Sequence, residues 1–357
     1  MNRRILYIST VLSVVLLLSA CTAAGSIRTF GVDEMKETRW AATRCEIYPG
    51  EVPHQEDYVI QWEDEGMEAH IRLLLDKPQG DIYHSDVWDI RILKIKPGNG
   101  EPHDVALKTP QDDDEVFDLQ AITSAENADK FWHVYEGKQF PPVESFADLR
   151  HFDNLQLLTC DFPGSGYTLA SLRGIEKCTN LQNLSLTSAK LGSMKELSEL
   201  KNLTHLTLLR CGSLDLEPLA NHPSLKVVQL DLSKVKSLEP LASILGLDYL
   251  SMWGDCGYPE LEPLSRSTIR YLNIGHSTVD KSEYEEMDYL AIGKIPNLVY
   301  LDTTGHDEVD VALCNTILEE SATLQYLILD YTTAAKELVK GKAVLETEGL
   351  KGLRFAP

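Results

Sequence analysis

The sequence predicts an α/β solenoid, with a curved parallel β-sheet on its concave face and turns, then helices, on its convex face. Three observations predict this fold. A template of three apolar residues, spaced apolar-x-x-apolar-x-apolar, recurs along most of the chain. Five successive copies begin 22 residues apart, and a Leu-Glu-Pro-Leu motif recurs between them. The chain of 357 residues is long for one compact core, whereas a repeat array grows by one layer at a time.

Each copy of the template predicts one short strand. Successive side chains of a strand point to opposite faces, so the second and third apolar residues face the core together. The five regularly spaced copies begin at Leu181, Leu203, Leu225, Leu247 and Ile269. Further copies begin at Ile90, Phe152, Leu298, Leu324 and Leu350. One coil cannot bury its apolar side alone, but stacked coils share a continuous core.

The convex side is predicted from the residues between the strands. The Leu-Glu-Pro-Leu motif occupies 216–219, 238–241 and 261–264, which begin 13, 13 and 14 residues after their strand starts. We expect a tight turn at each motif, with both leucines pointing inward. The later coils are longer, and helical composition and apolar spacing predict convex helices in 282–294, 309–320 and 334–346.

These motifs resemble the leucine-rich repeat (LRR) family over most of residues 90–357. That family usually has asparagine eight residues after the strand start, where its side chain binds neighbouring backbone. Here that column reads Cys160, Ala189, Cys211, Ser233, Asp255, Ser277, His306 and Thr332. We therefore expect looser hydrogen bonding between coils. Cys160 and Cys211 would lie two coils apart, about 10 Å at about 4.8 Å per strand, so buried free thiols are expected rather than a disulfide.

Residues 62–82 contain an acidic turn, an amphipathic segment and Lys-Pro-x-Gly-x-Ile. This pattern resembles the helical cap that precedes internalin-like LRR arrays, and Met67, Ile71, Leu74 and Leu75 share one helical face. The resemblance implies that this face covers the open end of the core. The predicted domains are a cap over 58–89, a first coil with an irregular insert over 90–151, and the main repeats over 152–357.

The first residues predict an export signal. Arg3 and Arg4 precede an apolar run from Ile5 to Leu18, which is shorter than the roughly 20 residues that a membrane-spanning helix needs. Leu18-Ser19-Ala20-Cys21 then resembles the lipobox of bacterial lipoproteins. The resemblance implies cleavage before Cys21 and a lipid on its thiol. We expect a signal peptide over 1–20, a lipidated tether over 21–57, and an extracytoplasmic, lipid-anchored protein of the bacterial envelope.

Charge and missing motifs exclude several functions. The net charge of −22 disfavours binding to nucleic acid or to anionic lipid. The chain has no Gly-x-Ser-x-Gly, His-Glu-x-x-His, P-loop or dinucleotide-binding motif, and its cysteines have no metal-site spacing. The acidic run 112–115 lacks the ligand spacing of an EF-hand. We therefore expect no cofactor, no metal and no catalysis.

One position of the template carries an aromatic series. Two residues after the strand start, four successive coils have Tyr249, Tyr271, Tyr300 and Tyr326. That position faces the concave side, where we expect an exposed column. Beside it the template places Asp231, Trp253, Asn273, Asp302 and Asp330. Tyrosine and tryptophan often anchor protein interfaces. Adjacent aromatic residues on neighbouring strands also stabilise a sheet, so a purely structural ladder is the second interpretation.

The leading hypothesis is a lipid-anchored protein that binds a protein or glycan ligand through its concave face. The acidic residues beside the tyrosines suggest a protein partner with a basic patch. One alternative is an extracytoplasmic enzyme with its site in 96–151, where His103, Asp104 and His133 lie. The other is a scaffold without a specific ligand. The sequence does not identify the ligand.

Overall fold

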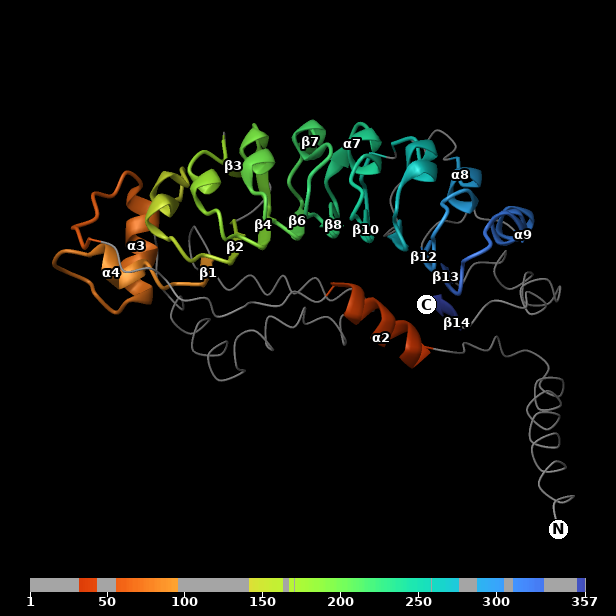
Figure 1. The fold of residues 1–357 in the computed structure, drawn as a ribbon, viewed down its shortest axis with the longest axis horizontal. Helices are drawn as coiled ribbons and strands as arrows, with labels where there is room; N and C mark the ends of the chain where they lie inside the picture. Colours follow the sequence, from red (N-terminus) through yellow and green to blue (C-terminus); the bar gives the residue numbers. More distant parts are fainter. Residues whose placement is uncertain are drawn as a thin grey trace, which may run out of the picture.

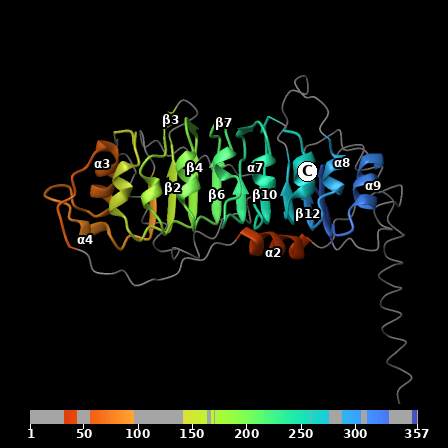
Figure 2. The same ribbon diagram turned by 45° about the horizontal axis from the view of Figure 1, so that its top comes forward.

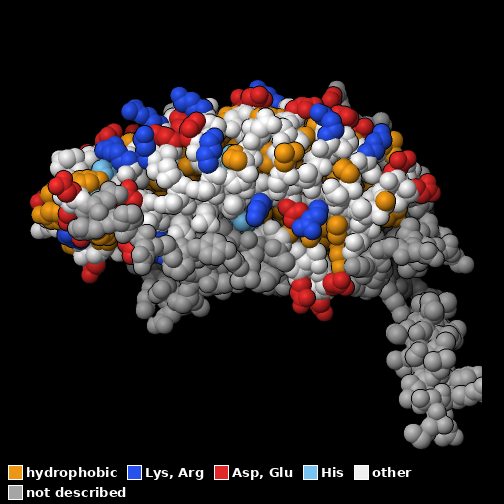
Figure 3. Space-filling model, viewed as in Figure 1, with side chains coloured by type: hydrophobic (Ala, Val, Ile, Leu, Met, Phe, Trp, Pro, Cys, Tyr) orange, Lys and Arg blue, Asp and Glu red, His pale blue; other side chains and the backbone are white. Residues whose placement is uncertain are grey.

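The computed structural model describes residues 32–43, 56–95, 141–162, 167–169, 171–257, 259–275, 288–304, 311–330 and 352–356. The described coils stack side by side along one axis in a shallow arc (Figures 1 and 2). Strands line the inner side of the arc, and short helices line its outer side. Charged side chains cover much of the outer surface (Figure 3).

The inner side is a ten-stranded parallel sheet in the order β1-β2-β4-β6-β8-β10-β11-β12-β13-β14. Its strands are β1 (Ile92–Ile95), β2 (Leu157–Asp161), β4 (Asn183–Thr187), β6 (His205–Leu209), β8 (Val227–Gln229), β10 (Tyr249–Ser251), β11 (Tyr271–Asn273), β12 (Tyr300–Asp302), β13 (Tyr326–Asp330) and β14 (Gly352–Ala356). The chain also forms two small parallel sheets of two strands each. One pairs β3 (Tyr167–Leu169) with β5 (Ala189–Leu191), and the other pairs β7 (Ser213–Leu214) with β9 (Lys234–Val235). The predicted α/β solenoid of the LRR type is confirmed.

The register agrees with the template for every assigned coil except one. Leu158 pairs with Leu184, and Cys160 pairs with Leu186. The template of that coil therefore starts at Leu155, and the start assigned to Phe152 is wrong by three residues. The error arose because Phe152, Leu155 and Leu157 are also apolar at the required spacing, and all three are buried. Cys160 consequently faces the core from β2 and does not belong to the column eight residues after the strand start.

The outer side consists of tight turns in the earlier coils and ends in one longer helix, α9. The turns are η2 (Ala147–His151), η3 (Ile175–Lys177), η4 (Lys195–Glu199), η5 (Glu217–Leu219), α7 (Glu239–Ala242) and η6 (Glu262–Arg266). The later coils have α8 (Leu290–Gly293) and α9 (Val311–Glu320). The helix expected over 309–320 is confirmed, only the end of 282–294 is described as helix, and 334–346 lies outside the described residues.

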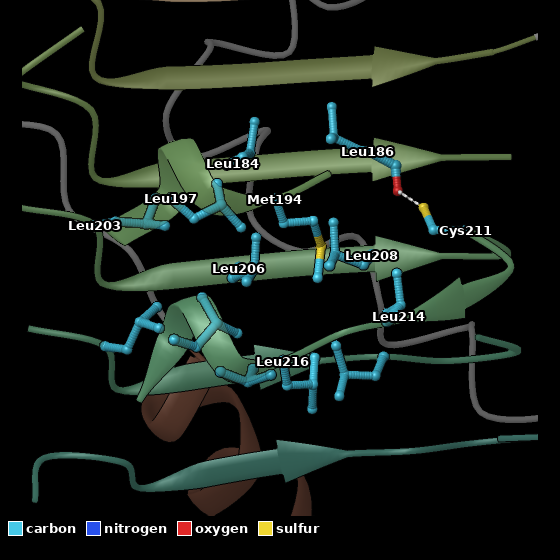
Figure 4. Packing of buried hydrophobic residues seen from close by; sticks show 14 of the residues in the cluster. Leu184, Leu186, Met194, Leu197, Leu203, Leu206, Leu208, Cys211, Leu214 and Leu216 are labelled. Carbon is cyan, nitrogen blue, oxygen red and sulfur yellow. Dashed lines mark hydrogen bonds between the residues drawn. The ribbon is translucent and has the colours of Figure 1, made fainter. Parts of the chain in front are cut away.

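A single hydrophobic core runs through the stacked coils, from Ile60 in the cap to Leu329 in β13. Figure 4 shows how two neighbouring coils fill it. Leu184 and Leu206 point inward from adjacent strands, while Met194 and Leu197 close the space from the outer side. Because each coil contacts mainly its neighbours, the core is continuous but local in its interactions.

Hydroxyl and thiol groups connect neighbouring coils where the family usually has asparagine. Ser233 Oγ donates to the carbonyl of Leu208 at 2.8 Å and accepts from the amide of Cys211 at 2.9 Å. Cys211 Sγ lies 3.3 Å from the carbonyl of Leu186 (Figure 4). Cys256 makes the same contact with the carbonyl of Leu230 at 3.5 Å, one residue later in a coil that carries the extra residue. The expected loosening between coils is therefore absent at these three positions.

The cap closes the first end of the core. Helix α3 (Glu65–Leu74) buries Met67 and Ile71, and Leu74 and Leu75 pack against the same core. Asp64 caps the helix by accepting from the amide of Met67 at 2.7 Å. Its other oxygen accepts from the amides of Glu144 and Ser145, both at 2.8 Å, and so attaches the cap to the chain before β2. A second short helix, α4 (His84–Val87), leads into β1.

Candidate binding face

The four tyrosines form a ladder across the concave face of the sheet. Tyr249 pairs with Tyr271, Tyr271 with Tyr300, and Tyr300 with Tyr326 in the strand register. The ring centroids of successive tyrosines are 6.4, 6.2 and 6.4 Å apart. Such spacing lets each ring contact the next, which stabilises neighbouring strands and builds one continuous aromatic surface.

The ladder is not exposed, and the expected exposed column is wrong in this respect. Tyr249, Tyr271, Tyr300 and Tyr326 are 1%, 7%, 4% and 3% exposed. Helix α2 (Val32–Thr43) lies across this part of the sheet (Figures 1 and 2). Its Met35, 2% exposed, packs in one cluster with the four tyrosines and the strand residues Val227 and Ile328. The concave surface is therefore covered by a segment from the N-terminal region of the same chain.

A hydrogen bond joins the helix to the last tyrosine. Tyr326 Oη donates to Glu34 Oε1 at 2.5 Å. Burial and this bond together hold the pKa of Tyr326 above its ordinary value of 10.0, because a buried phenolate beside a carboxylate is unfavourable. Burial likewise raises the pKa of Tyr271, whose ring also carries the Arg270 guanidinium at 5.3 Å from its centroid.

Helix α2 carries many charges. Five of its twelve residues are charged, and Asp33, Glu34 and Glu37 are exposed, so that acidic side chains gather over the helix in Figure 3. Ordering backbone costs about 1–2 kcal/mol per residue, and short helices are marginal by themselves. The helical state of α2 therefore depends on its contacts with the sheet.

The expectation for 21–57 needs a related correction. The sequence predicts a tether over this segment, whereas α2 within it is a helix whose Met35 side chain is buried against the sheet. Its charged composition hides the signal. Met35, Thr38 and Ala42 recur at helical spacing and are buried or half-buried among the described side chains of α2. This pattern among charged residues is too weak to predict docking.

The polar residues beside the ladder mostly hold the sheet itself. Asp231 Oδ1 accepts from the hydroxyl of Ser251 at 2.7 Å and from the amide of Trp253 at 2.8 Å. Asn273 Oδ1 accepts from the amide of Gly275 at 2.9 Å. These oxygens are occupied by the neighbouring backbone, which leaves less of each side chain for a ligand.

Asp302 and Trp253 complete the described set. Asp302 is 1% exposed, and its Oδ1 accepts from the amide and hydroxyl of Thr304 at 3.0 and 2.6 Å. Trp253 is half-buried and lies over Gly275, where a Cβ atom would come within 2.9 Å of the indole. The side chain of Asp330 lies outside the described part. Of the acidic residues, Asp231 and Asp302 are therefore used structurally.

The other half of the concave face has a different character. On β4 and β6, the residues on the same side of the sheet include Ser185, Thr187, Thr207 and Leu209, all half-buried. Apart from Leu209, these side chains are small and polar, whereas the second half offers a nearly continuous aromatic surface. The two halves thus differ in what they can bind, and α2 lies on the aromatic one.

Potential metal ligands do not gather in the part of the chain that the structure describes. There, no group of three or more His, Cys, Asp and Glu residues could hold a metal ion. Cys160, Cys178, Cys211 and Cys256 are buried and free, as expected, and burial raises the pKa of the Cys211 thiol to about 12. The alternative enzyme site is expected in 96–151, and residues 96–140 of that segment, with His103, Asp104 and His133, lie outside the described residues. No described helix has the length and apolar character needed to cross a bilayer.

Comparison with known proteins finds a leucine-rich repeat relative over a short part of the chain. No protein-family model matches the chain. A segment is 33% identical over 96 residues to human leucine-rich repeat-containing protein 56, which is 27% of this chain and 17% of that protein. The chain therefore matches less than a fifth of that relative's length.

Two solved structures are similar in fold. Internalin C2 from Listeria monocytogenes str. 4b F2365 has a TM-score of 0.37 and 18% identity, covering 60% of this chain and 76% of that one. An internalin (inlF) from the same source has a TM-score of 0.36 and 14% identity, covering 82% and 91%. The strands, turns and core described above define the present chain as an LRR solenoid.

Proposed function

We propose that this protein is a non-catalytic binding module that recognises a protein ligand through the tyrosine ladder of its concave face. One observation carries the proposal. Tyr249, Tyr271, Tyr300 and Tyr326 belong to a cluster that is separate from the core of the solenoid. Their rings lie on the outside of the repeat and are available to a second element. Four rigid aromatic side chains in a row provide a large contact area at low entropic cost.

We also propose that the protein is anchored by a lipid on Cys21 at the extracytoplasmic side of a bacterial envelope. The support is the charged start, the apolar run and the lipobox of the sequence. The net charge of −22 favours a partner with a basic patch through long-range attraction. That attraction arises from the whole surface, because Asp231 and Asp302 are engaged within the sheet.

Capture of the ligand from envelope extracts tests the binding role. The full-length protein is compared with the double variant Tyr271→Ala/Tyr300→Ala and with Tyr83→Ala, which removes an exposed tyrosine from the cap, away from the ladder. The wild type and Tyr83→Ala should capture the same protein, and the double variant should lose it. Full capture by a folded double variant would contradict the proposal. Circular dichroism establishes that each variant is folded.

Two alternatives make different predictions. If the ladder only stabilises the sheet, the double variant melts earlier and no protein is captured by any variant. If an enzyme site lies in 96–151, catalytic activity persists in the double variant. The separation of the tyrosine cluster from the solenoid core favours the binding role.

A further inference from the structure

We propose that α2 is an intramolecular competitor of the partner. It occupies the tyrosine ladder in the place that a helix of the partner would take, and the partner binds by displacing α2. The inference rests on the proposed binding role of the concave face and specifies the kind of partner. Among the described residues, α2 is the element that packs on this surface, so the surface is already complementary to a helix.

The contacts of α2 define what such a helix must offer. Met35 belongs to the buried cluster that the tyrosines of four successive coils form. One residue earlier, Glu34 accepts a hydrogen bond from the hydroxyl of Tyr326. The helix lies along the stack of coils and not along one strand (Figures 1 and 2), so one short helix spans several coils. The partner chemistry is therefore an amphipathic helix with an unbranched apolar side chain beside a carboxylate.

Release of α2 leaves the solenoid intact. The cluster under α2 contains none of the residues that form the main core. Among the α2 side chains that the structure describes, Asp33, Glu34 and Glu37 are exposed and Met35 is fully buried. A segment that lies outside the main core can open locally without global unfolding. Opening would expose the tyrosines that share a cluster with Met35.

Tethering explains how a marginal helix can still compete. A segment that belongs to the same chain as its site acts at a high effective concentration, which can reach millimolar order. A partner helix can bind only the molecules in which α2 is released. Its apparent affinity is therefore its affinity for the open ladder multiplied by the fraction of molecules with α2 released. The device makes binding selective for helices that fit the ladder better than α2 does.

The experiment uses a fluorescent peptide of residues 31–44 and full-length variants. Met35→Lys places a charge in the buried cluster and should release α2. Glu37→Gln changes the net charge by the same amount at an exposed position of the same helix and is the matched control. Glu34→Gln is a milder second variant, because it weakens the bond to Tyr326 while the peptide retains its own glutamate.

Fluorescence anisotropy should show that Met35→Lys binds the peptide at least about tenfold more tightly than the wild type or Glu37→Gln. Glu34→Gln should be intermediate. Adding Tyr271→Ala and Tyr300→Ala to Met35→Lys should abolish binding. Equal binding by all folded variants, or no binding to Met35→Lys at about 1 mM peptide, overturns the inference.

Capture from envelope extracts separates this inference from the proposed function. If Met35→Lys captures more ligand than the wild type, both are supported. If capture is the same in the two but is lost in Tyr271→Ala/Tyr300→Ala, the ladder binds a ligand and the competitor role of α2 is wrong. If no variant captures a protein although the peptide binds Met35→Lys, the proposed function fails, and α2 is only an internal ligand.

Discussion

At the scale of the residue, two buried histidines near the cap have lowered pKa values. His70 is completely buried in the cap, and burial lowers its pKa from 6.5 to about 4. His151 lies near the same end, hydrogen-bonded at Nδ1 to Tyr58 Oη at 2.8 Å. Burial and the nearby Arg150 lower its pKa to about 4 as well. Both imidazoles are neutral in the folded cap at neutral pH.

Acidification should therefore destabilise the cap. A histidine whose folded pKa is lowered binds protons more readily when unfolded, so its stabilising contribution is complete above about pH 6.5 and is lost as the pH falls towards 4. For His70 the loss approaches about 3 kcal/mol. Hydrogen exchange of α3 measured from pH 7 to pH 4 should show the change. His70→Gln should flatten the dependence, and an unchanged slope would exclude His70 as its source.

The hydroxyl of Ser233 provides a second prediction at this scale. Ser233→Ala removes the donor to Leu208 and the acceptor for the buried amide of Cys211, so it should cost about 1–3 kcal/mol. Ser233→Cys should retain most of the stability, because Cys211 and Cys256 make the same contact with thiols. Ser213→Ala, at an exposed serine, is the control. Equal melting temperatures for Ser233→Ala and Ser213→Ala would contradict the structural role of this hydroxyl.

At the scale of the element, the sequence predicts what is repeated and misses what occurs once. The 22-residue period specifies strands, turns and register from Leu181 onward, because five coils repeat the same pattern. The coil before them is ambiguous, since apolar residues fit both the Phe152 and the Leu155 start. Helix α2 has no counterpart in the repeat, and its docking depends on Met35 meeting a distant surface. The tyrosines were located correctly by register, but their burial depends on that helix.

The register has a direct test. Leu206 and Leu250 are completely buried on β6 and β10, so Leu206→Ala and Leu250→Ala should each cost about 2–5 kcal/mol. Leu245 is 86% exposed between coils, and Leu245→Ala makes the same chemical change with almost no effect expected. Because coils interact mainly with their neighbours, hydrogen exchange should increase most in the coils beside each substitution. Thermal melts that do not separate the core variants from Leu245→Ala would refute the assigned burial.

At the scale of the whole molecule, the proposed anchor and the concave face belong to one continuous stretch of chain. Cys21 precedes Val32, the first residue of α2, by eleven positions, and α2 lies on the tyrosine ladder. The proposed membrane attachment is therefore close in sequence to the segment that covers the binding face. Under this arrangement, removing the lipid changes where the protein is held but leaves the contacts between Met35 and the ladder unchanged.

Cys21→Ala tests the anchor. The thiol is the atom that would carry the lipid, and the lipobox requires cysteine at the cleavage site, so the variant should remain an uncleaved precursor and should not incorporate a clickable fatty acid. Cys45→Ala, which removes the next cysteine outside the lipobox, is the matched control and should be processed and labelled normally. Two buried acyl chains suffice for stable attachment at about 0.8 kcal/mol per CH₂, so the wild type should fractionate with membranes. Normal cleavage and labelling of Cys21→Ala would show that the lipobox assignment is wrong. The proposals for the tyrosine ladder and for α2 do not depend on this outcome.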